Sequence, residues 1–541
     1  MRDLMQDWPL SVGRILDHAA KYHGARPVIS RTTEGPIVTS NWAEVHLGAR
    51  KCTQALQRLG LKPGEVVGVM AWNTARMLEV WYGVPGVGAA LHTLNPRLFA
   101  DQLVYVINHA EDRFLMVDRD LLPVIANVRD QLPNVEAIIV MTDAANMPDS
   151  PLEGLLCYGD LVAAEDGDTS WTKVDERDAC GICYTSGTTG NPKGVVFTHR
   201  SNTLHAFASS APDMLGLSAN DRAMPVVPLF HANGWSTAYT TPMNGASMVM
   251  PGNNMTPAGL YEMLEHGVTV TAAVPTVWLA LLQYLGAEKK TFSTLKRVVI
   301  GGSSCPRAVI EAFQNIYGVQ VIHAWGMTEM SPLGTICTFK PEVNAMDAAA
   351  KLDMQETVGH PPFTVDLKII GEDGATLPND GATQGRLMAR GDAVVGSYLK
   401  AETPAVDADQ WFDTGDMATI DANGYTKITD RSKDVIKSGG EWISSIDLEN
   451  AAVGHPEVAE AAAIGMPHEK WGERPVLVVV PMPGTAPDPD DILALVAKKF
   501  AKWQVPDAVI FRQDIPHTAT GKISKLNLRQ QIHDEGFSFD G

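Results

Sequence analysis

The sequence predicts an α/β protein, with a large N-terminal body of helix-covered parallel sheets and a small separate α+β domain at the C-terminus. Three observations support this fold class. The chain has 541 residues, with 45% apolar and 20% charged side chains, which is typical of a globular protein with a large core. Strand-like and amphipathic helical segments alternate over roughly the first 430 residues, as in parallel sheets. After about Tyr425 the segments form a shorter, compact series.

The first predicted elements follow one another closely. Asn41 and Glu44 have the spacing of a helix N-cap and its third-position acid, so we expect a helix from 41 to Gly60, a C-cap glycine. The apolar run 66–70 is the next expected strand, because its length fits a buried strand. Further along we expect a helix at 74–82 and strands at 114–117, 137–141, 268–274, 297–300 and 319–324.

The C-terminal series predicts a small α+β domain of about 110 residues. Its expected elements are a helix at 445–453, strands at 458–464 and 475–481, a helix at 488–502 and a strand at 508–512. The charged segment 430–434 joins this domain to the body. The residues after the second helix, around 517–523, have the composition of an exposed loop.

The charge distribution argues against nucleic acid and membrane surfaces as partners. With 43 Lys and Arg against 63 Asp and Glu, the net charge is −20, which repels phosphate backbones and anionic lipid. The Lys289-Lys290 and Lys498-Lys499 pairs are isolated. No apolar run reaches the roughly 20 residues that span a bilayer, and the N-terminus lacks the apolar core of a signal peptide. We expect a cytoplasmic protein with no integral membrane segment.

The six cysteines are too few for a disulfide framework in a chain of this length. Cys180 and Cys183 have CxxC spacing, but no second CxxC or His pair accompanies them, and they lie in an apolar run. We therefore expect a pair of core residues on a buried strand.

The strongest local signal follows that strand. Its sequence is Tyr184-Thr185-Ser186-Gly187-Thr188-Thr189-Gly190-Asn191-Pro192-Lys193-Gly194. Glycines let backbone N–H groups turn toward an anion, hydroxyls add donors and Lys193 adds positive charge, so the segment predicts a loop that binds a nucleotide's phosphates. Pro192 and Gly194 break the GxxxxGK[ST] pattern, which disfavours a kinase or P-loop ATPase.

This loop resembles the phosphate loop of the adenylate-forming superfamily of acyl-CoA synthetases, luciferases and peptide-synthetase adenylation domains. Further segments that resemble the family occur in the family's order over essentially the whole chain. They are Trp325-Gly326-Met327-Thr328-Glu329, Asp413-Thr414-Gly415-Asp416, the segment 430–441 and Gly521-Lys522. The resemblance also implies a β-rich subdomain in the N-terminal body and a mobile C-terminal domain.

The chemistry of adenylation explains these residue types. A carboxylate must attack the α-phosphorus of ATP, so two anions have to be brought together. The resemblance implies that Glu329 and Thr185 hold Mg²⁺ and that Lys522 is the catalytic lysine, and these cations would neutralise the developing charge. It implies that Asp416 binds the ribose hydroxyls and that Arg431 helps to hold the ribose or the phosphate. The remaining implied ATP and AMP contacts are Ser186, Gly187, Thr188, Thr189, Gly190, Lys193, Gly302, Ser303, Ser304, His323, Ala324, Trp325, Gly326, Met327, Thr328 and Lys437.

The resemblance further implies domain alternation. It divides the chain into an N-terminal domain at 1–430, a hinge at 431–434 and a mobile C-terminal domain at 435–541, with Lys433 as the hinge residue. Lys522 would enter the site for adenylation, and the domain would then rotate so that the thiol of CoA reaches the acyl-adenylate. Gly439, Gly440, Glu441 and Trp442 would face the CoA tunnel in that second orientation.

The acyl site is expected around Pro228-Leu229-Phe230-His231-Ala232-Asn233-Gly234-Trp235, which resembles the acyl-pocket segment of fatty acyl-CoA synthetases. The resemblance implies that Trp235 gates the tail's tunnel and that His231, assigned a catalytic role, lies beside the carboxylate and thiol path, with Gly302 and Pro332 nearby. Apolar walls are expected from 274–278 and 301–305. Because these segments carry no cationic side chain, an uncharged aliphatic or thioether acid is expected. Medium- or long-chain fatty acids and 3-methylmercaptopropionate remain alternatives.

The expected function is an AMP-forming acid:CoA ligase that uses ATP, Mg²⁺, CoA and a carboxylic acid. A stand-alone adenylation enzyme that loads a carrier-protein thiol is one alternative, although no carrier domain follows Lys522 in the chain. A luciferase-like oxygenase has no supporting feature. A catalytically inactive nucleotide sensor would be expected to lack Lys522 or Glu329, and both are present. A homodimer is expected by analogy alone.

Overall fold

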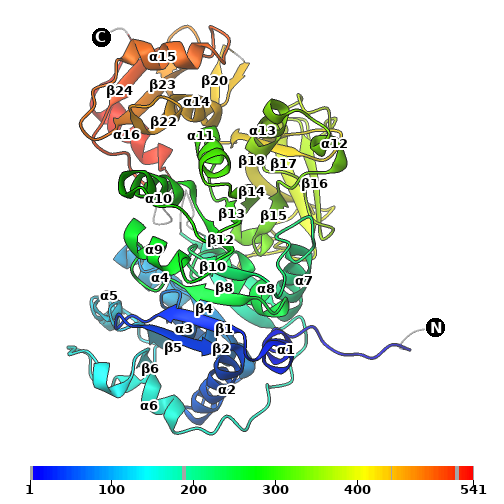
Figure 1. The fold of residues 1–541 in the computed structure, drawn as a ribbon, viewed down its shortest axis with the longest axis vertical. Coiled ribbons are helices and arrows are strands. Elements are labelled where there is room, and N and C mark those ends of the chain that lie inside the picture. Colours follow the sequence, from blue (N-terminus) through cyan, green and yellow to red (C-terminus); the bar gives the residue numbers. More distant parts are fainter. Residues whose placement is uncertain (1–3, 186–190, 440, 518–522, 540–541) are drawn as a thin grey trace.

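The structure is a computed structural model that describes residues 4–185, 191–439, 441–517 and 523–539. Figure 1 shows a broad body at the bottom and centre, a small β subdomain at the upper right and a C-terminal domain at the upper left, above α10 and α11. Of the predicted site residues, Ser186, Gly187, Thr188, Thr189, Gly190, Gly440 and Lys522 lie outside the described residues.

The first large sheet of the body has seven strands, and all neighbours except β8 and β9 are parallel. In spatial order they are β7 (Leu156–Cys157), β6 (Ala137–Val140), β5 (Asp112–Val117), β3 (Val66–Met70), β4 (Ala90–Thr93), β8 (Ala179–Thr185) and β9 (Lys193–Thr198). Strand β8 carries Cys180 and Cys183, and both are buried free thiols, so the predicted core pair is confirmed.

The second large sheet has eight strands and is parallel except at its two edges. In spatial order they are β15 (Leu333–Ile336), β14 (Gln320–Gly326), β13 (Arg297–Ile300), β12 (Val270–Ala273), β10 (Arg222–Pro225), β11 (Ser247–Met250), β1 (Pro27–Arg31) and β2 (Ile37–Asn41). The predicted α/β body is confirmed, since both large sheets are mostly parallel and their strands alternate with helices along the chain. Parallel strands that are buried on both faces need such helices to cover them.

The body's helices are α1 (Gly13–His23), α2 (Trp42–Arg58), α3 (Ala75–Gly86), α4 (Ala100–Ala110), α5 (Leu122–Ala126), α6 (Tyr158–Ala163), α7 (His199–Ser209), α8 (Thr237–Met243), α9 (Pro257–Leu264), α10 (Pro275–Glu288) and α11 (Arg307–Glu311). Single turns are η1 (Arg129–Gln131), η2 (Ala144–Asn146), η3 (Ala232–Ser236), η5 (Thr328–Met330) and a π-helical turn, η4 (Ala312–Ile316). The predicted capping by Asn41 is confirmed, since its side chain accepts a hydrogen bond from Glu44 N at 3.0 Å.

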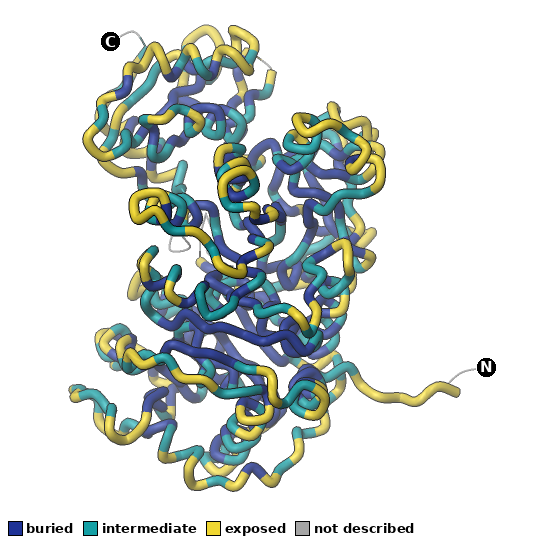
Figure 2. The backbone as a smooth tube through the Cα atoms, in the orientation of Figure 1, coloured by how far each residue is buried: buried dark blue, intermediate teal, exposed yellow. Residues whose placement is uncertain are grey.

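One core joins the two large sheets. A single cluster of buried apolar side chains includes Val69 of β3, Met248 of β11, Leu78 of α3 and Ala238 of α8. Figure 2 shows this as buried chain running through the centre of the body, while exposed chain lies mainly at the periphery. The sheets are therefore fixed relative to each other, so loops at the ends of their strands can form one site.

The β-rich subdomain is a four-stranded antiparallel sheet, with strands in sequence order β16 (Val365–Ile370), β17 (Gly385–Gly391), β18 (Phe412–Ile420) and β19 (Thr426–Arg431). Two short helices, α12 (Pro341–Asn344) and α13 (Ala348–Glu356), precede it. Strand β18 carries the 413–416 segment, so the subdomain brings that segment to the body.

The C-terminal domain is α+β as predicted. Its sheet has the order β21 (Glu441–Ile443), β20 (Ile436–Ser438), β23 (Gly472–Pro481) and β22 (Val458–His468), with β24 (Ala508–Phe511) beside β23. Its helices are α14 (Ser445–Val453), α15 (Pro489–Ala497) and α16 (Lys525–Asp534). The helix predicted to reach 502 ends at Ala497, because its buried face ends at Val496 and the next residues are mostly exposed.

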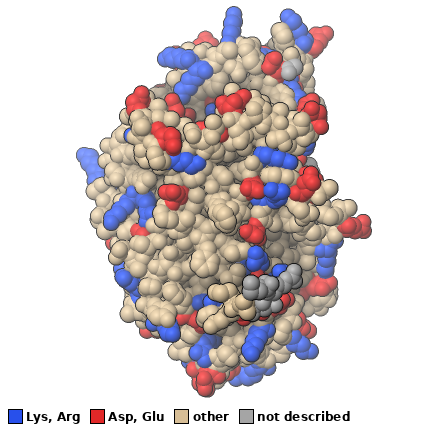
Figure 3. Space-filling view, turned by 90° about the vertical axis from the view of Figure 1, so that its right-hand side faces the viewer, with Lys and Arg blue, Asp and Glu red and all other residues tan. Residues whose placement is uncertain are grey.

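No helix in the described part of the chain has the length and apolar character to cross a bilayer. On the face shown in Figure 3, Lys and Arg side chains alternate with Asp and Glu side chains.

Candidate active site

A cavity of about 1580 Å³ lies where the two large sheets, the β subdomain and the C-terminal domain meet. Thr185 at the end of β8, Gly301 after β13 and Trp325 near the end of β14 all line it. The carboxyl ends of parallel strands from both sheets therefore open into one space, which is where ligands bind in open α/β sheets. The β subdomain contributes Thr414, and the C-terminal domain contributes Lys525.

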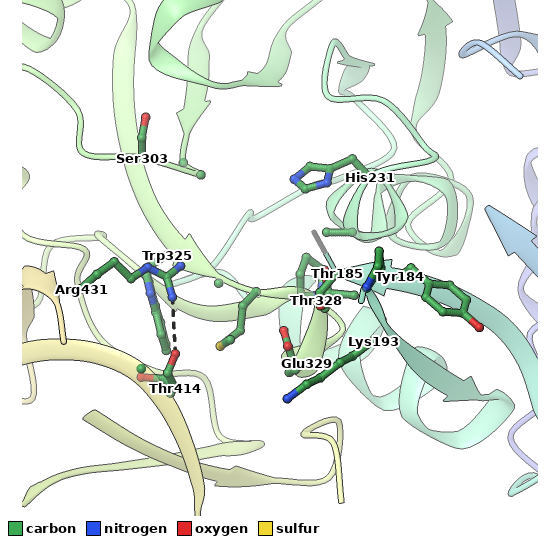
Figure 4. A pocket seen from close by; sticks show the side chains of 18 of the residues that line it. Tyr184, Thr185, Lys193, His231, Ser303, Trp325, Thr328, Glu329, Thr414 and Arg431 are labelled. Atoms are coloured by element: carbon green, nitrogen blue, oxygen red, sulfur yellow. Dashed lines mark hydrogen bonds between the residues drawn. The ribbon is translucent and has the colours of Figure 1, made fainter. Parts of the chain in front are cut away.

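The flanks of the predicted phosphate loop lie on one side of this cavity. Thr185 and Lys193 line it, together with Thr328 and Glu329 from η5 (Figure 4). The Lys193 ammonium lies 4.9 Å from the centre of the Tyr398 ring. A cation, two hydroxyls and a carboxylate therefore converge beside the ends of the loop.

Glu329 is held by a residue that the sequence analysis did not identify. Its carboxylate accepts a hydrogen bond from the Tyr398 hydroxyl at 2.9 Å. Glu329 as a whole is only 7% exposed. Burial, and then the neighbouring Glu329 carboxylate, raise the pKa of Tyr398 well above its usual range, so the phenol stays a donor. Tyr398 lies 69 residues from Glu329 in the chain and belongs to no pattern that could have marked it.

Hard oxygen donors of this kind fit Mg²⁺. No group of three or more His, Cys, Asp or Glu side chains able to hold a metal occurs in the described ranges. Mg²⁺ commonly binds through one or two carboxylates together with substrate phosphates, so Glu329 and the Thr185 hydroxyl are a suitable donor set beside a phosphate loop.

The opposite side of the cavity carries Trp325, Thr414 and Arg431 (Figure 4). Asp416 is 2% exposed and does not line the cavity, although Thr414 and Gly415 beside it do. Its two carboxylate oxygens accept a hydrogen bond from Trp325 Nε1 at 2.9 Å and pair with Arg431 Nε at 2.9 Å. The predicted ribose contact of Asp416 stays a prediction.

Most of the predicted nucleotide contacts after β13 and along β14 line the cavity, and one does not. Gly302, Ser303, Ser304 and the residues 324–328 line the cavity. His323 does not, because its side chain is buried beneath the wall of β14, and burial lowers the pKa of its imidazole to about 4.

The acyl side contains His231, Trp235 and Pro332, and all three line the cavity. Trp235 lies within a turn, 232–236, in which every residue has a left-handed backbone, with φ from 45° to 64°. L-residues other than Gly, Asn and Asp rarely adopt this conformation, so the turn is held by its surroundings. Gly234 is required there, because a Cβ would meet Leu229 Cδ2 at 2.3 Å.

The walls near Trp235 carry no formal charge. Among the described lining residues, Leu215, Ala272, Val299 and Leu333 belong to the same apolar cluster as Trp235. His205 lies behind Leu333 and accepts a hydrogen bond from Leu333 N through Nε2 at 2.9 Å. Burial lowers the pKa of His205 to about 3, so this imidazole is neutral.

The prediction that the segment 274–278 forms an apolar wall of the site is mostly wrong. Thr276 is the residue of that segment that lines the cavity, whereas Trp278 is fully buried. Residues 275–278 form the first turn of α10, which directs Trp278 into the core against Phe313, with ring centres 5.8 Å apart. Cys305 of the other expected wall is also buried in that core.

The C-terminal domain turns its α16 end toward the cavity. His517 and Ile523, which flank the segment containing Lys522, line it, as do Ser524 and Lys525. Lys433 of the predicted hinge lines it as well, and burial lowers the pKa of its ammonium.

The described residues of the β20–β21 hairpin do not line the cavity. Lys437, Gly439, Glu441 and Trp442 are absent from its described lining, and the Lys437 ammonium lies 5.5 Å from the centre of the Trp442 ring. The predicted contact of Lys437 with phosphate in one domain orientation, and those of Gly439, Glu441 and Trp442 with CoA in the other, stay predictions.

The chain is similar over its length to known enzymes. Residues 16–399 match the family model described as "AMP-binding enzyme", and residues 447–522 match "AMP-binding enzyme C-terminal domain". It is 48% identical to the 3-methylmercaptopropionyl-CoA ligase of Ruegeria pomeroyi over 97% of this chain and 98% of that one. It is 46% identical to the medium-chain-fatty-acid–CoA ligase of Ectopseudomonas oleovorans, over 97% and 96% of the two chains.

Solved structures agree on the fold. The crystal structure of the anthranilate CoA ligase AuaEII in complex with anthranoyl-AMP matches with a TM-score of 0.87 and 26% identity, over 98% of this chain and all of that one.

Proposed function

The chain belongs to the AMP-binding enzyme family, and from that premise we propose that it is an AMP-forming acid:CoA ligase. ATP and a carboxylic acid give an acyl-adenylate and diphosphate, and the thiol of CoA then takes the acyl group and releases AMP. The observation that carries the proposal is the single cavity in which Thr185, Glu329 and Arg431 lie within reach of an uncharged pocket beside His231 and Trp235. Full-length relatives named as CoA ligases, at 46% and 48% identity, support it.

In the first step the protein has to bring two anions together. Thr185 and Glu329 would hold Mg²⁺, which supplies positive charge to the phosphate oxygens when it is bound. Lys193 adds a cation beside the phosphate loop. Arg431 would orient the nucleotide from the opposite wall, where it already contacts the Asp416 carboxylate at 2.9 Å. Positioning and charge neutralisation therefore account for most of the expected rate enhancement.

Lys522 would provide its ammonium to the acid and the α-phosphate during adenylation. Rotation of the C-terminal domain about Lys433 would then remove it and bring Gly439, Gly440, Glu441 and Trp442 toward CoA. The position of His517 and Ile523 at the cavity supports the adenylation orientation for this structure. Homodimerisation and a cytoplasmic location stay predictions from the sequence.

The acid would be an uncharged aliphatic or thioether acid. The described walls beside Trp235 offer no cation for a second carboxylate, and a charged acyl tail would lose its hydration there without a partner. The names of the relatives are compatible with both 3-methylmercaptopropionate and medium-chain fatty acids.

The proposal is tested by measuring diphosphate release with ATP, Mg²⁺ and CoA for linear acids of two to sixteen carbons, 3-methylmercaptopropionate and succinate. We expect release with at least one uncharged acid, with formation of its CoA thioester, and none above background with succinate. The absence of acid-dependent diphosphate for the whole panel would contradict the proposal.

Replacement of the predicted catalytic lysine tests the mechanism. Lys522→Ala should lower acid-dependent ATP–diphosphate exchange by about 100-fold or more, because the charge at the α-phosphate is lost, while ATP binding changes little. Exchange and nucleotide binding are measured on the same preparation. Lys499→Ala, on an exposed position of the same domain, is the control and should leave both unchanged.

A further inference from the structure

A buried His–Asp pair lies in the seven-stranded sheet, next to the strand that leads into the predicted phosphate loop. His92 of β4 and Asp112 of β5 are both 0% exposed, and His92 Nδ1 lies 2.9 Å from each carboxylate oxygen of Asp112. Strand β3 runs between β4 and β5, so the two side chains must meet across it. They meet at Gly68, where a Cβ would lie 2.6 Å from Asp112 Oδ2. The missing side chain at Gly68 leaves the space for this pair.

The second nitrogen of the His92 imidazole, Nε2, is the subject of the proposal. His92 Nε2 is buried without a hydrogen-bond partner among the described residues. His92 also lines a small cavity of about 20 Å³. Because Nδ1 faces the Asp112 carboxylate, Nε2 is the ring nitrogen that is left for a different partner. A buried polar atom of this kind requires a partner, which points to a ligand in the cavity.

The small cavity adjoins the active-site cavity. Tyr184, Thr185, Pro192 and His231 line both of them. The Tyr184 ring lies 5.0 Å from the His92 ring, and its hydroxyl is fixed by His109 Nδ1 at 2.7 Å. The wall between the small cavity and the active-site cavity is therefore formed by residues on both sides of the predicted phosphate loop and by His231.

A volume of about 20 Å³ fits one water molecule, for which roughly 10–15 Å³ is the minimum. Such a water also needs two to four polar partners. The polar side chains around the cavity are His92, Thr93, Asn95, Tyr184, Thr185 and His231. The site is thus polar enough and large enough for one internal water.

We propose that this cavity binds one water on His92 Nε2, and that the water positions Thr185 and His231 for adenylation. The proposal rests on the proposed function, because the roles of Thr185 at the metal and of His231 at the acyl group come from it. The Asp112 carboxylate fixes the imidazole, the imidazole fixes the water, and the water fixes the wall that both cavities share. His92 and Asp112 are positioning residues, since neither lines the active-site cavity.

Two substitutions remove the water in different ways. His92→Asn keeps a donor near Asp112 and removes the nitrogen at the cavity. Val106→Ile leaves the His92–Asp112 pair intact and fills the cavity, which Val106 lines from α4. Val104→Ile on the same helix is the matched control, because Val104 packs on the same core without lining the cavity.

Acid-dependent ATP–diphosphate exchange is measured against MgATP, free Mg²⁺ and acid concentration. We expect both His92→Asn and Val106→Ile to lower kcat/KM for MgATP by about 10- to 100-fold and to raise the Mg²⁺ concentration needed for half-maximal rate, as for other groups that orient metal ligands. The control should stay within about twofold of the wild type. Loss of packing alone would lower Tm in all three variants and would not move the Mg²⁺ dependence.

The proposal is overturned if the wild type is active and folded Val106→Ile keeps the wild-type kcat/KM and Mg²⁺ dependence. It is also overturned if a high-resolution crystal structure shows no water within hydrogen-bonding distance of His92 Nε2. Neither result affects the proposed function, which fails only if the wild type itself forms no acyl-adenylate.

Discussion

At the scale of single residues, one phenolic hydroxyl fixes the Glu329 carboxylate in the cavity wall. Tyr398 donates to Glu329 at 2.9 Å, and the Lys193 ammonium lies over the same ring. A metal-ligating carboxylate that is held by a second hydrogen bond needs no reorganisation when the metal binds. The geometry of this side of the site therefore depends on a residue that touches neither substrate nor metal in the proposed mechanism.

Tyr398→Phe tests this dependence. It removes only the hydroxyl, so we expect kcat/KM for MgATP to fall by about 10- to 100-fold and the required Mg²⁺ concentration to rise. Steady-state kinetics at several Mg²⁺ concentrations provide the measurement. Tyr82→Phe is a matched control, because Tyr82 is also buried and its hydroxyl donates to Ala238 O away from the cavity. Equal kinetic effects of the two variants would argue against a role for Tyr398 in holding Glu329.

The neutral state of His205 links stability to pH. Its Nε2 accepts a hydrogen bond from Leu333 N, and burial lowers the pKa from 6.5 to about 3. The folded-state pKa is therefore the lower one. The stability contributed by neutral His205 is fully present above pH 6.5 and is lost as the pH falls from 6.5 toward 3.

His205→Gln should reduce this pH dependence, because the glutamine amide oxygen can accept from Leu333 N and does not titrate. Between pH 6.5 and 4, the free energy of unfolding should fall less steeply in the variant, by up to about 1.4 kcal/mol per pH unit for one proton. Denaturant unfolding at a series of pH values measures the slope. His533→Gln on exposed α16 should keep the wild-type slope, and an unchanged slope in His205→Gln would refute the assignment.

At the scale of elements, local patterns identified what short stretches of chain form. The strands predicted at 66–70 and 297–300 and the helix predicted at 445–453 have the bounds of β3, β13 and α14. Helix α16 was not predicted, since its sequence is polar and only Leu528 and Ile532 are buried in it. Its position is set by packing of these two side chains on β22 and β23, together with ion pairs to α14 and to Asp434.

Helix α16 is attached to α14 by a poorly exposed ion pair. The Lys525 ammonium lies 2.7 Å from the Glu449 carboxylate, with side chains that are 10% and 15% exposed. Lys525→Met should destabilise the C-terminal domain by about 3–5 kcal/mol, because it leaves Glu449 buried without a counter-charge. Adding Glu449→Gln should recover part of that loss, since the amide oxygen can still accept from Ala463 N. Additive losses in chemical unfolding would show that the pair is not coupled.

At the scale of the whole molecule, the orientation of the C-terminal domain decides which residues reach the site. Asp430, before the predicted hinge, accepts hydrogen bonds from Ser445 N and Ser445 Oγ at 2.7 Å each. Asn450 of α14 donates to Ser304 Oγ of the body at 2.7 Å. A rotation of the domain about Lys433 would change these contacts, so they favour the present orientation.

Asn450→Ala should therefore act differently on the two half-reactions. Loss of a hydrogen bond worth about 1 kcal/mol should slow adenylation by about fivefold and leave transfer of a preformed acyl-adenylate to CoA unchanged or faster. Single-turnover measurements separate the two steps. Gln530→Ala is the control, because Gln530 donates a hydrogen bond to Asp534 within α16. A uniform slowing of both steps would contradict an orientation effect.

The sequence by itself determined the fold class and the bounds of elements such as β3, β13 and α14, because each is specified by residues close together in the chain. The tertiary structure decided what depends on distant residues. It joined Tyr398 to Glu329 across 69 positions and His205 to Leu333 across 128, and it turned Trp278 and His323 away from the cavity. It also let Asp112 reach His92 past Gly68. Such contacts follow from how sheets and helices pack, and no local spacing encodes them.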